Sequence, residues 1–286
     1  MKILAIGDFH GKFPEKLKKR IEKEKIDLII SIGDYIPFHY RKLWFKHCYG
    51  KDIELWEIIG KAKYKKLVIK DLKIGDSVLK NLNKLSIPII SIVGNLDYPG
   101  YIDTQDSRVI NTKKRIWKWD NQDFLNKLLK KYKKIKRFDY DYTKFNNLIF
   151  IGGFGHSNPG DIKSKTHKKY LKRLDNLFKK FRKENKKRKV IFVFHNMPYN
   201  CKLDLIRDKK ADKRARYKHY GSKLTRRIIN KYQPILGIGG HMHENQGKCK
   251  IGRTLVINTG AAYKGKAVII EFNEKKGKVE RLKFVG

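Results

Sequence analysis

Short apolar runs recur along the whole chain, and most of them are followed by a glycine and a polar residue. The runs are only a few residues long and are rich in Ile and Val. Runs of this kind, each ended by turn-forming residues, predict buried strands. We therefore expect strands at residues 3–6, 28–32, 89–93, 148–151, 190–194, 235–238, 255–257 and 267–272.

Between these runs, apolar residues recur at every third or fourth position, which is the spacing of an amphipathic helix. Pro14 opens one such segment, in which Leu17 and Ile21 share a face. Similar patterns lie at residues 124–132, 170–181 and 222–232, and Ser222 is placed to act as the N-cap of the last one. Strands that alternate with helices indicate an α/β protein.

Two longer stretches, residues 35–87 and 98–147, lie between strands that carry polar motifs, and we interpret both as insertions. The chain shows no internal repeat and no Gly/Ser-rich linker. We therefore expect one domain that spans residues 1–286, with the two insertions as additions to it.

The charge balance points to a class of partner. Lys and Arg number 69 against 28 Asp and Glu, which gives a net charge of +41 at pH 7. Such a surface attracts polyanions, nucleic acid among them. Ion-pair networks of thermophilic proteins would raise Glu together with Lys, and Glu is scarce here. Codon bias towards lysine is the alternative explanation.

The sequence also limits the compartment. No apolar stretch approaches the roughly 18 residues that a membrane-spanning helix needs, and the apolar start of the chain is too short for a secretory signal. Cys48, Cys201 and Cys249 lie far apart and lack the spacing of a disulfide framework or a zinc knuckle. We expect a cytoplasmic protein without a membrane span, and the sequence does not predict an oligomeric state.

Side chains of metal-binding types follow five of the predicted strands. Open α/β sheets place their sites at the carboxyl ends of strands, so these side chains can converge. In chain order the five segments are Gly7-Asp8-Phe9-His10-Gly11, Gly33-Asp34, Gly94-Asn95-Leu96-Asp97, His195-Asn196 and Gly239-Gly240-His241-Met242-His243.

The spacing within these segments fits metal binding. Asp8 and His10 are two residues apart, as are His241 and His243, and such pairs point the same way in extended backbone. Carboxylates, imidazoles and one amide suit Mn, Fe, Co, Ni or Zn. Seven ligands are too many for one tetrahedral ion, so they predict a two-metal site with one bridging carboxylate. Each segment alone is also a common turn, and their joint order carries the prediction.

The five segments, in this order, resemble the motif blocks of the calcineurin-like metallophosphoesterases. They run from Asp8 to His243 and so cover most of the chain. Residues 202–260, which include Gly240-His241-Met242-His243-Glu244 and Asn258-Thr259-Gly260, are similar to archaeal predicted phosphoesterases of the cyclic-nucleotide-phosphodiesterase-like branch. The resemblance implies a four-layer α/β/β/α sandwich with two mixed β-sheets and two metal ions between them.

The resemblance also implies ligands for each ion. The first ion would be held by Asp8, His10, Asp34 and His243. The second would be held by Asn95, His195, His241 and the bridging Asp34. Asp97 stands where the family has an acidic residue that orients its neighbours at the catalytic centre.

One position departs from the family pattern. Where the third block usually carries a histidine, this chain has Leu96, which can neither offset charge nor donate a proton to the leaving group. Branches that lack this histidine often show phosphodiesterase activity. The departure leaves all seven ligand positions intact.

The resemblance and the ligand set lead to an expected mechanism. A hydroxide formed from a water between two cations attacks phosphorus in line, and Asn95 helps to offset charge on the equatorial oxygens. We expect His219 to protonate the leaving group, the alternative being a surface histidine in a basic loop. We expect manganese as the metal, with Fe, Ni, Co or Zn as alternatives.

Basic segments favour a nucleotide or nucleic-acid substrate, either RNA or DNA. Trp117 and Trp119 stand among lysines and would suit base stacking, or else they pack beneath an insertion. The predicted helix at 165–189 has a polar face that could follow a phosphate backbone, formed by Lys172, Arg173, Lys179, Lys180, Arg182 and Lys183.

Two other functions remain open: a phosphomonoesterase or protein phosphatase, which Leu96 disfavours, and a metal-bound nucleic-acid-binding scaffold with little turnover.

Overall fold

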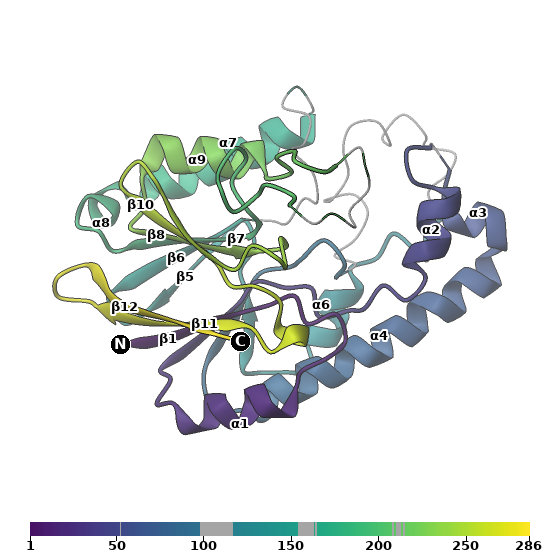
Figure 1. Cartoon of the computed structure of the whole chain (residues 1–286), viewed down its shortest axis with the longest axis horizontal. Coiled ribbons are helices and arrows are strands. Elements are labelled where there is room, and N and C mark those ends of the chain that lie inside the picture. Colours follow the sequence, from purple (N-terminus) through teal and green to yellow (C-terminus); the bar gives the residue numbers. More distant parts are fainter. Residues whose placement is uncertain are drawn as a thin grey trace.

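The structure is a computed structural model, and it describes residues 1–51, 53–97, 117–153, 163, 165–207, 209, 213 and 215–286. The described chain forms two six-stranded sheets. Helices lie against the outer face of each sheet, so that the molecule has four layers (Figure 1). The predicted α/β/β/α sandwich is therefore confirmed.

The first sheet has the strand order β12-β11-β1-β2-β3-β4. Strands β1 to β4 run parallel to one another, whereas β11 is antiparallel to β1 and β12 is antiparallel to β11. The sheet is therefore mixed, as expected. In the order of the sheet, the strands span Lys278–Val285, Ala267–Asn273, Lys2–Ile6, Leu28–Ser31, Ile89–Ser91 and Ile135–Arg137.

The second sheet has the strand order β5-β6-β7-β8-β10-β9. Strands β6, β7, β8 and β10 are parallel, and the two outer strands pair antiparallel to their neighbours. This sheet is mixed as well. Its strands span Tyr142–Phe145, Leu148–Gly152, Val190–Asn196, Leu236–Gly240, Thr254–Asn258 and Gly247–Ile251.

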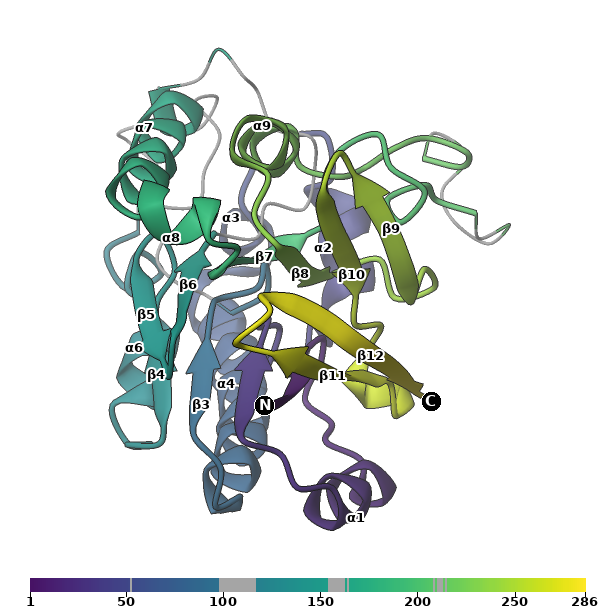
Figure 2. The same cartoon turned by 90° about the vertical axis from the view of Figure 1, so that its left-hand side faces the viewer.

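The helices divide between the two outer faces. Figures 1 and 2 place α1 and α4 against the first sheet, and α7, α8 and α9 against the second. Helices α2 and α3 pack near one end of α4. The helices span Glu15–Lys23 (α1), Arg41–His47 (α2), Leu55–Ile59 (α3), Lys61–Lys84 (α4), Phe124–Leu129 (α6), Lys165–Lys180 (α7), Arg182–Lys186 (α8) and Lys223–Tyr232 (α9).

The core between the sheets follows from the alternation of side chains along each strand. In β1, Ile3 and Ala5 join a cluster with Ile191 and Val193 of β7, so the two sheets bury apolar surface against each other. Residues of the opposite parity in β1 pack with the helices that cover the first sheet. Each central strand is thus buried on both faces, which explains its continuous apolar run.

All eight predicted strands are present, with ends shifted by a few residues. The predicted helices are present too, and Ser222 caps α9, since its hydroxyl accepts a hydrogen bond from the Thr225 N–H. Strands β4, β5, β9 and β12 were not predicted, nor were α2, α3 and α4, and the single helix predicted at 165–189 is divided into α7 and α8. No helix of the described chain is long and apolar enough to span a membrane.

Candidate metal centre

The ends of five parallel strands bring the predicted residues to one place. Asp8, Asp34 and Asn95 follow β1, β2 and β3 of the first sheet, while His195 lies in β7 and His241 follows β8 of the second. These strands all end at the same edge of the sandwich, so residues far apart in the sequence meet there.

The backbone at this edge is unusual. Four of the seven predicted ligands are non-glycine residues with positive φ, with values of 54° at Asp8, 44° at His10, 57° at Asp34 and 68° at His241. Each such residue costs about 1 kcal/mol or more and persists only where the surrounding structure holds it. Here the Asp8 N–H donates to the carbonyl of Gly33, and the His10 N–H donates to that of Asp34, both at 2.9 Å.

Close packing of these turns explains one of the glycines. Gly33 has a φ of 86°, and a Cβ placed on it would lie 2.0 Å from the backbone nitrogen of Gly94. The turns after β2 and β3 therefore approach each other so closely that a side chain at position 33 would separate them.

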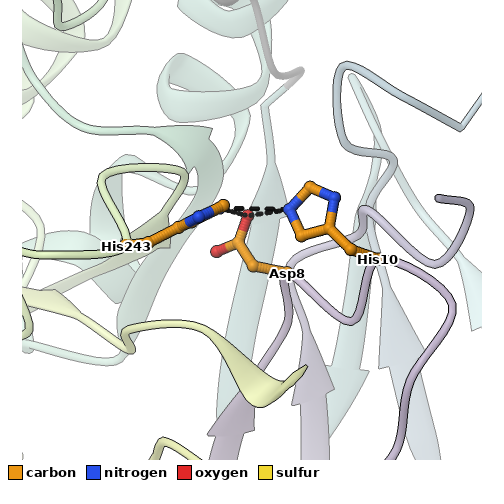
Figure 3. Close-up of side chains that lie close together, drawn as sticks. All are labelled: Asp8, His10 and His243. Carbon is orange, nitrogen blue, oxygen red and sulfur yellow. Dashed lines mark hydrogen bonds and ion pairs between the residues drawn. The ribbon is translucent and has the colours of Figure 1, made fainter. Parts of the chain in front are cut away.

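The first cluster consists of Asp8, His10 and His243, which converge as Figure 3 shows. His243 Nε2 lies 3.4 Å from Asp8 Oδ1 and 3.1 Å from His10 Nε2. His10 Nε2 lies 4.0 Å from Asp8 Oδ1. The Asp8 side chain is fully buried, whereas those of His10 and His243 are 19% and 24% exposed.

The second cluster consists of Asp34, His195 and His241, with Asn95 beside them. His195 Nε2 lies 3.4 Å from Asp34 Oδ2, 3.2 Å from His241 Nδ1 and 2.8 Å from Asn95 Oδ1. The side chains of Asp34 and His195 are buried. His195 Nδ1 is 2.8 Å from the Ile32 carbonyl, which fixes the ring with Nε2 pointing into the cluster.

Both carboxylates lie between the two clusters. Asp34 Oδ2 is 3.8 Å from His10 Nε2 in the first cluster and 3.4 Å from His195 Nε2 in the second. Asp8 Oδ1 likewise lies 3.9 Å from His195 Nε2. The carboxylates of Asp34 and Asp8 therefore each lie within 4 Å of a histidine of both clusters.

The donor atoms fit divalent cations. Ligands at about 2.0–2.2 Å from one ion lie about 3.0–3.5 Å from each other, and the closest pairs above fall near this range. Asp8 Oδ1 is buried and has no hydrogen-bond partner among the described residues, which is costly unless a cation neutralises it. His10 Nε2 and His243 Nε2, 3.1 Å apart, can share one N–H as a hydrogen bond or bind one cation between them.

Electrostatics within the second cluster favour a charged pair. Burial opposes the imidazolium of His195, but the carboxylates of Asp34 and Asp8 outweigh it and raise its pKa to about 9. Burial also works against ionisation of Asp34, yet His195 lowers the pKa of this carboxyl below its usual value. Burial and the neighbouring His195 lower the pKa of His241 to about 3, so this ring is neutral and able to bind a metal.

Asp97 holds the backbone of the centre and is not a member of either cluster. Its carboxylate accepts hydrogen bonds from the N–H groups of Asp34, Tyr35 and Gly94, at 2.7–2.8 Å, and a longer one from Ile36. Burial and the Asp34 carboxylate raise the pKa of Asp97 to about 7. Leu96 contributes only its N–H, which donates to Asp34 Oδ1 at 2.8 Å.

His219 belongs to a separate dyad. Its Nδ1 lies 2.6 Å from Asp204 Oδ1, and Asp204 is buried and accepts from the N–H groups of Asn200, Cys201 and Gly221. No contact within the described chain joins His219 to the metal-ligand atoms. The structure therefore gives this histidine a fixed orientation without placing it in the clusters.

Three further features were not identified from the sequence. The Tyr263 hydroxyl lies 3.4 Å from His243 Nδ1, and its ring packs against His10. The Asn258 amide donates to the Met242 carbonyl and so holds the turn between two predicted ligands. His39 forms a second dyad with buried Asp71, at 2.6 Å. Of these three features, only Asn258 belongs to a sequence motif noted above, Asn258-Thr259-Gly260.

The basic and aromatic segments are partly as predicted. The six basic residues predicted for the polar face of α7 and α8 are all exposed. Trp117 and Trp119 are half-buried, and their rings lie near those of Trp56 in α3, Tyr64 in α4 and Phe124 in α6, so they pack among these three helices. Residues 113–116, which directly precede Trp117, lie outside the described residues.

The chain is similar to known proteins over most of its length. Residues 1–245 match the calcineurin-like phosphoesterase family. The uncharacterized protein MJ1162 of Methanocaldococcus jannaschii is 24% identical over 262 residues, which cover 90% of this chain and 87% of that protein.

Two solved structures share the architecture across nearly their whole length. TT1561 of Thermus thermophilus has a TM-score of 0.52 at 15% identity and covers 99% of this chain and 97% of its own. A dimetal phosphatase from Danio rerio has a TM-score of 0.52 at 11% identity, with coverages of 100% and 96%. At such identities the likeness shows the fold alone.

Proposed function

We propose that this chain, which belongs to the calcineurin-like phosphoesterase family, hydrolyses phosphodiesters with the help of two divalent metal ions. Membership of the family implies a phosphoester hydrolase. The observation that carries the proposal is the pair of adjoining clusters with Asp34 between them. Two cations held there would acidify a water and offset negative charge on a phosphoryl group.

The residues divide into two ligand sets. Asp8, His10, Asp34 and His243 would hold one ion, and Asp34, Asn95, His195 and His241 the other. The carbonyl of Ile32 keeps the Nε2 of His195 aimed at its ion, and Asp97 keeps the turn of Asp34 in place. Mixed oxygen and nitrogen donors suit manganese, which we propose as the metal, and Fe, Ni, Co or Zn would fit the same set.

Leu96 supports a diester substrate. Leucine cannot donate a proton to a leaving group, and branches of the family that lack a histidine at this position often show phosphodiesterase activity. We propose that Asn95 helps to orient the phosphoryl group and that His219 protonates the leaving group. Asp204 supports this role, because its bond to Nδ1 leaves Nε2 of His219 as the atom that can carry the transferable proton.

The proposed substrates are nucleotides or nucleic acid. The net charge of +41 and the exposed basic face of α7 and α8 support polyanion binding. The three cysteines are free thiols, which supports a reducing, cytoplasmic setting.

Hydrolysis of bis(p-nitrophenyl) phosphate by the manganese-loaded protein tests the proposal. We expect activity, a slower reaction with p-nitrophenyl phosphate, and loss of both on Asp34→Ala or His241→Ala. Each ion contributes several kcal/mol of charge stabilisation, and about 1.4 kcal/mol corresponds to a tenfold rate change, so the loss is about 10³-fold. His47→Ala in α2 is the matched histidine control. Inactivity of the wild type with Mn, Ni, Fe, Co and Zn alike contradicts the proposal.

A further inference from the structure

Four of the six residues that line a pocket on the outer side of α9 are cationic. Its volume is about 440 Å³, and no acidic residue lines it. The lining residues are Tyr199, Lys223, Arg226, Arg227, Asn230 and Lys231.

The pocket follows from the helical period of α9. Lys223, Arg227 and Lys231 are four residues apart and share one exposed face. Leu224 and Ile228 are buried on the other side of the helix. Like charges at this spacing repel one another, and cations near the start of a helix oppose its dipole. Repulsion among these cations therefore destabilises α9, and a bound anion would reduce that repulsion.

Little of this positive charge is neutralised within the protein. Lys231 pairs with Asp175 at 3.1 Å, and Arg226 donates to the carbonyls of Tyr199 and Asn200. Lys223 lies over the Tyr199 ring, which provides no full charge. In the part of the chain that the structure describes, no carboxylate contacts Lys223 or Arg227. Two cations thus remain available to an anion.

The pocket also contains an aromatic side chain that the chain connects closely to the proposed site of reaction. Tyr199 follows His195 by four residues, and an extended chain of that length spans no more than about 14 Å. The Tyr199 ring is in edge contact with His219, at 6.1 Å between centroids. Successive phosphates of a stacked strand advance by about 3.4 Å, so a strand bound at the metal centre can reach the pocket within about four nucleotides.

We propose that this pocket binds the phosphate backbone of single-stranded nucleic acid, with a base against Tyr199, while another phosphodiester of the same strand reaches the metal centre. The inference rests on the proposed function and names its substrate class. Lys223 and Arg227 contact phosphates, and Tyr199 offers a stacking surface of the kind that non-specific strand binders use. Helix α7 lies beside α9 (Figure 1) and extends the basic surface.

Strand binding without metal tests the pocket separately from catalysis. Fluorescein-labelled oligothymidylate and oligouridylate of about twelve nucleotides are titrated in a chelator, and binding is followed by anisotropy at several salt concentrations. The test variant is Lys223→Gln with Arg227→Gln. The matched control is Lys19→Gln with Arg20→Gln, which removes the same charge from exposed positions of α1, on the opposite side of the molecule.

We expect the α9 variant to bind at least about tenfold more weakly. Its slope of log affinity against log salt should be smaller by about 1.4, since each phosphate contact of a single strand contributes about 0.7. The α1 control should keep the slope of the wild type. Tyr199→Ala should weaken binding about fivefold or more without changing the slope, because stacking involves no charge.

Two results would overturn the inference. One is equal binding by the α9 variant and the α1 control. The other is a protein that binds inorganic polyphosphate but not oligonucleotides, with equal polyphosphate affinity in the wild type and Tyr199→Ala. That outcome would assign the pocket to a ligand without bases. The binding test measures no hydrolysis, so it can be interpreted even if the enzyme is inactive. Conversely, hydrolysis of bis(p-nitrophenyl) phosphate tests the proposed function even if no oligonucleotide binds.

Discussion

The two halves of the candidate metal centre contain similar residues but differ in how firmly these are held. In the second cluster, His195 is fully buried and its Nδ1 contacts the Ile32 carbonyl at 2.8 Å. In the first, His10 and His243 are partly exposed, and the Nδ1 of His243 has only a long contact of 3.4 Å to Tyr263. A ring that is already oriented loses little freedom on binding, so we expect the second cluster to hold its ion more tightly.

Removing one histidine from each half is the strongest way to break this comparison. We expect His195→Ala to lose both ions, because it also releases the paired Asp34 carboxylate that serves both halves. His10→Ala should keep the ion of the second cluster. Metal content per chain, measured by elemental analysis after gel filtration, should therefore be near zero for the first variant and near one for the second. Equal metal content in the two variants contradicts the difference between the halves.

Asp97→Asn tests the support beneath both halves. Asparagine keeps the shape but directs an NH₂ group at N–H donors, so two hydrogen bonds of Asp97 are lost. We expect metal affinity to fall 10- to 100-fold, as for other residues that orient ligands, and unfolding to become easier by about 1–3 kcal/mol. Calorimetry with Mn²⁺ and thermal unfolding in a chelator measure the two effects. Asp141→Asn, in the loop between β4 and β5, is the control.

The pH dependence of metal binding tests the charge of the second cluster. Because the pKa of His195 is raised to about 9 in the metal-free protein, its ring carries a proton at neutral pH that a cation must displace. Affinity should therefore rise about tenfold per pH unit between pH 6 and 8 and level off near pH 9. Titration calorimetry in buffers of different ionisation enthalpy should show about one proton released. Affinity that stays constant or falls over this range contradicts the charged pair.

The sequence allowed prediction of the central strands but not of the edges. The four missed strands, β4, β5, β9 and β12, are the outermost strands of the two sheets. A central strand is buried on both faces and reads as a continuous apolar run, whereas an edge strand exposes lysines that discourage further pairing. In β9, for example, Lys248 and Lys250 are exposed and alternate with half-buried residues.

Helix α4 was missed for a different reason. Its buried positions, such as Tyr64, Val68, Leu72 and Leu79, keep the helical period, but lysines between them obscure it, and residues 35–87 had been interpreted only as an insertion. The predicted ligand positions were easier to identify, because each lies next to a strong strand signal. The partners that orient the candidate site residues, such as Asp204 beside His219, depend on tertiary contacts that no local pattern encodes.

Tyr263 is such a partner, and its removal is the finest test of the comparison between the two halves. Tyr263→Phe keeps the ring beside His10 and removes only the hydroxyl that lies 3.4 Å from His243 Nδ1. Since this contact is long and solvent competes for it, we expect affinity at the first cluster to fall less than about tenfold, the low end for orienting residues. The ion of the second cluster should be unaffected. Stepwise release of Mn²⁺ to a chelator separates the two ions, and only the faster step should accelerate. A change confined to the slower step would mean that His243 helps to hold the tightly bound ion.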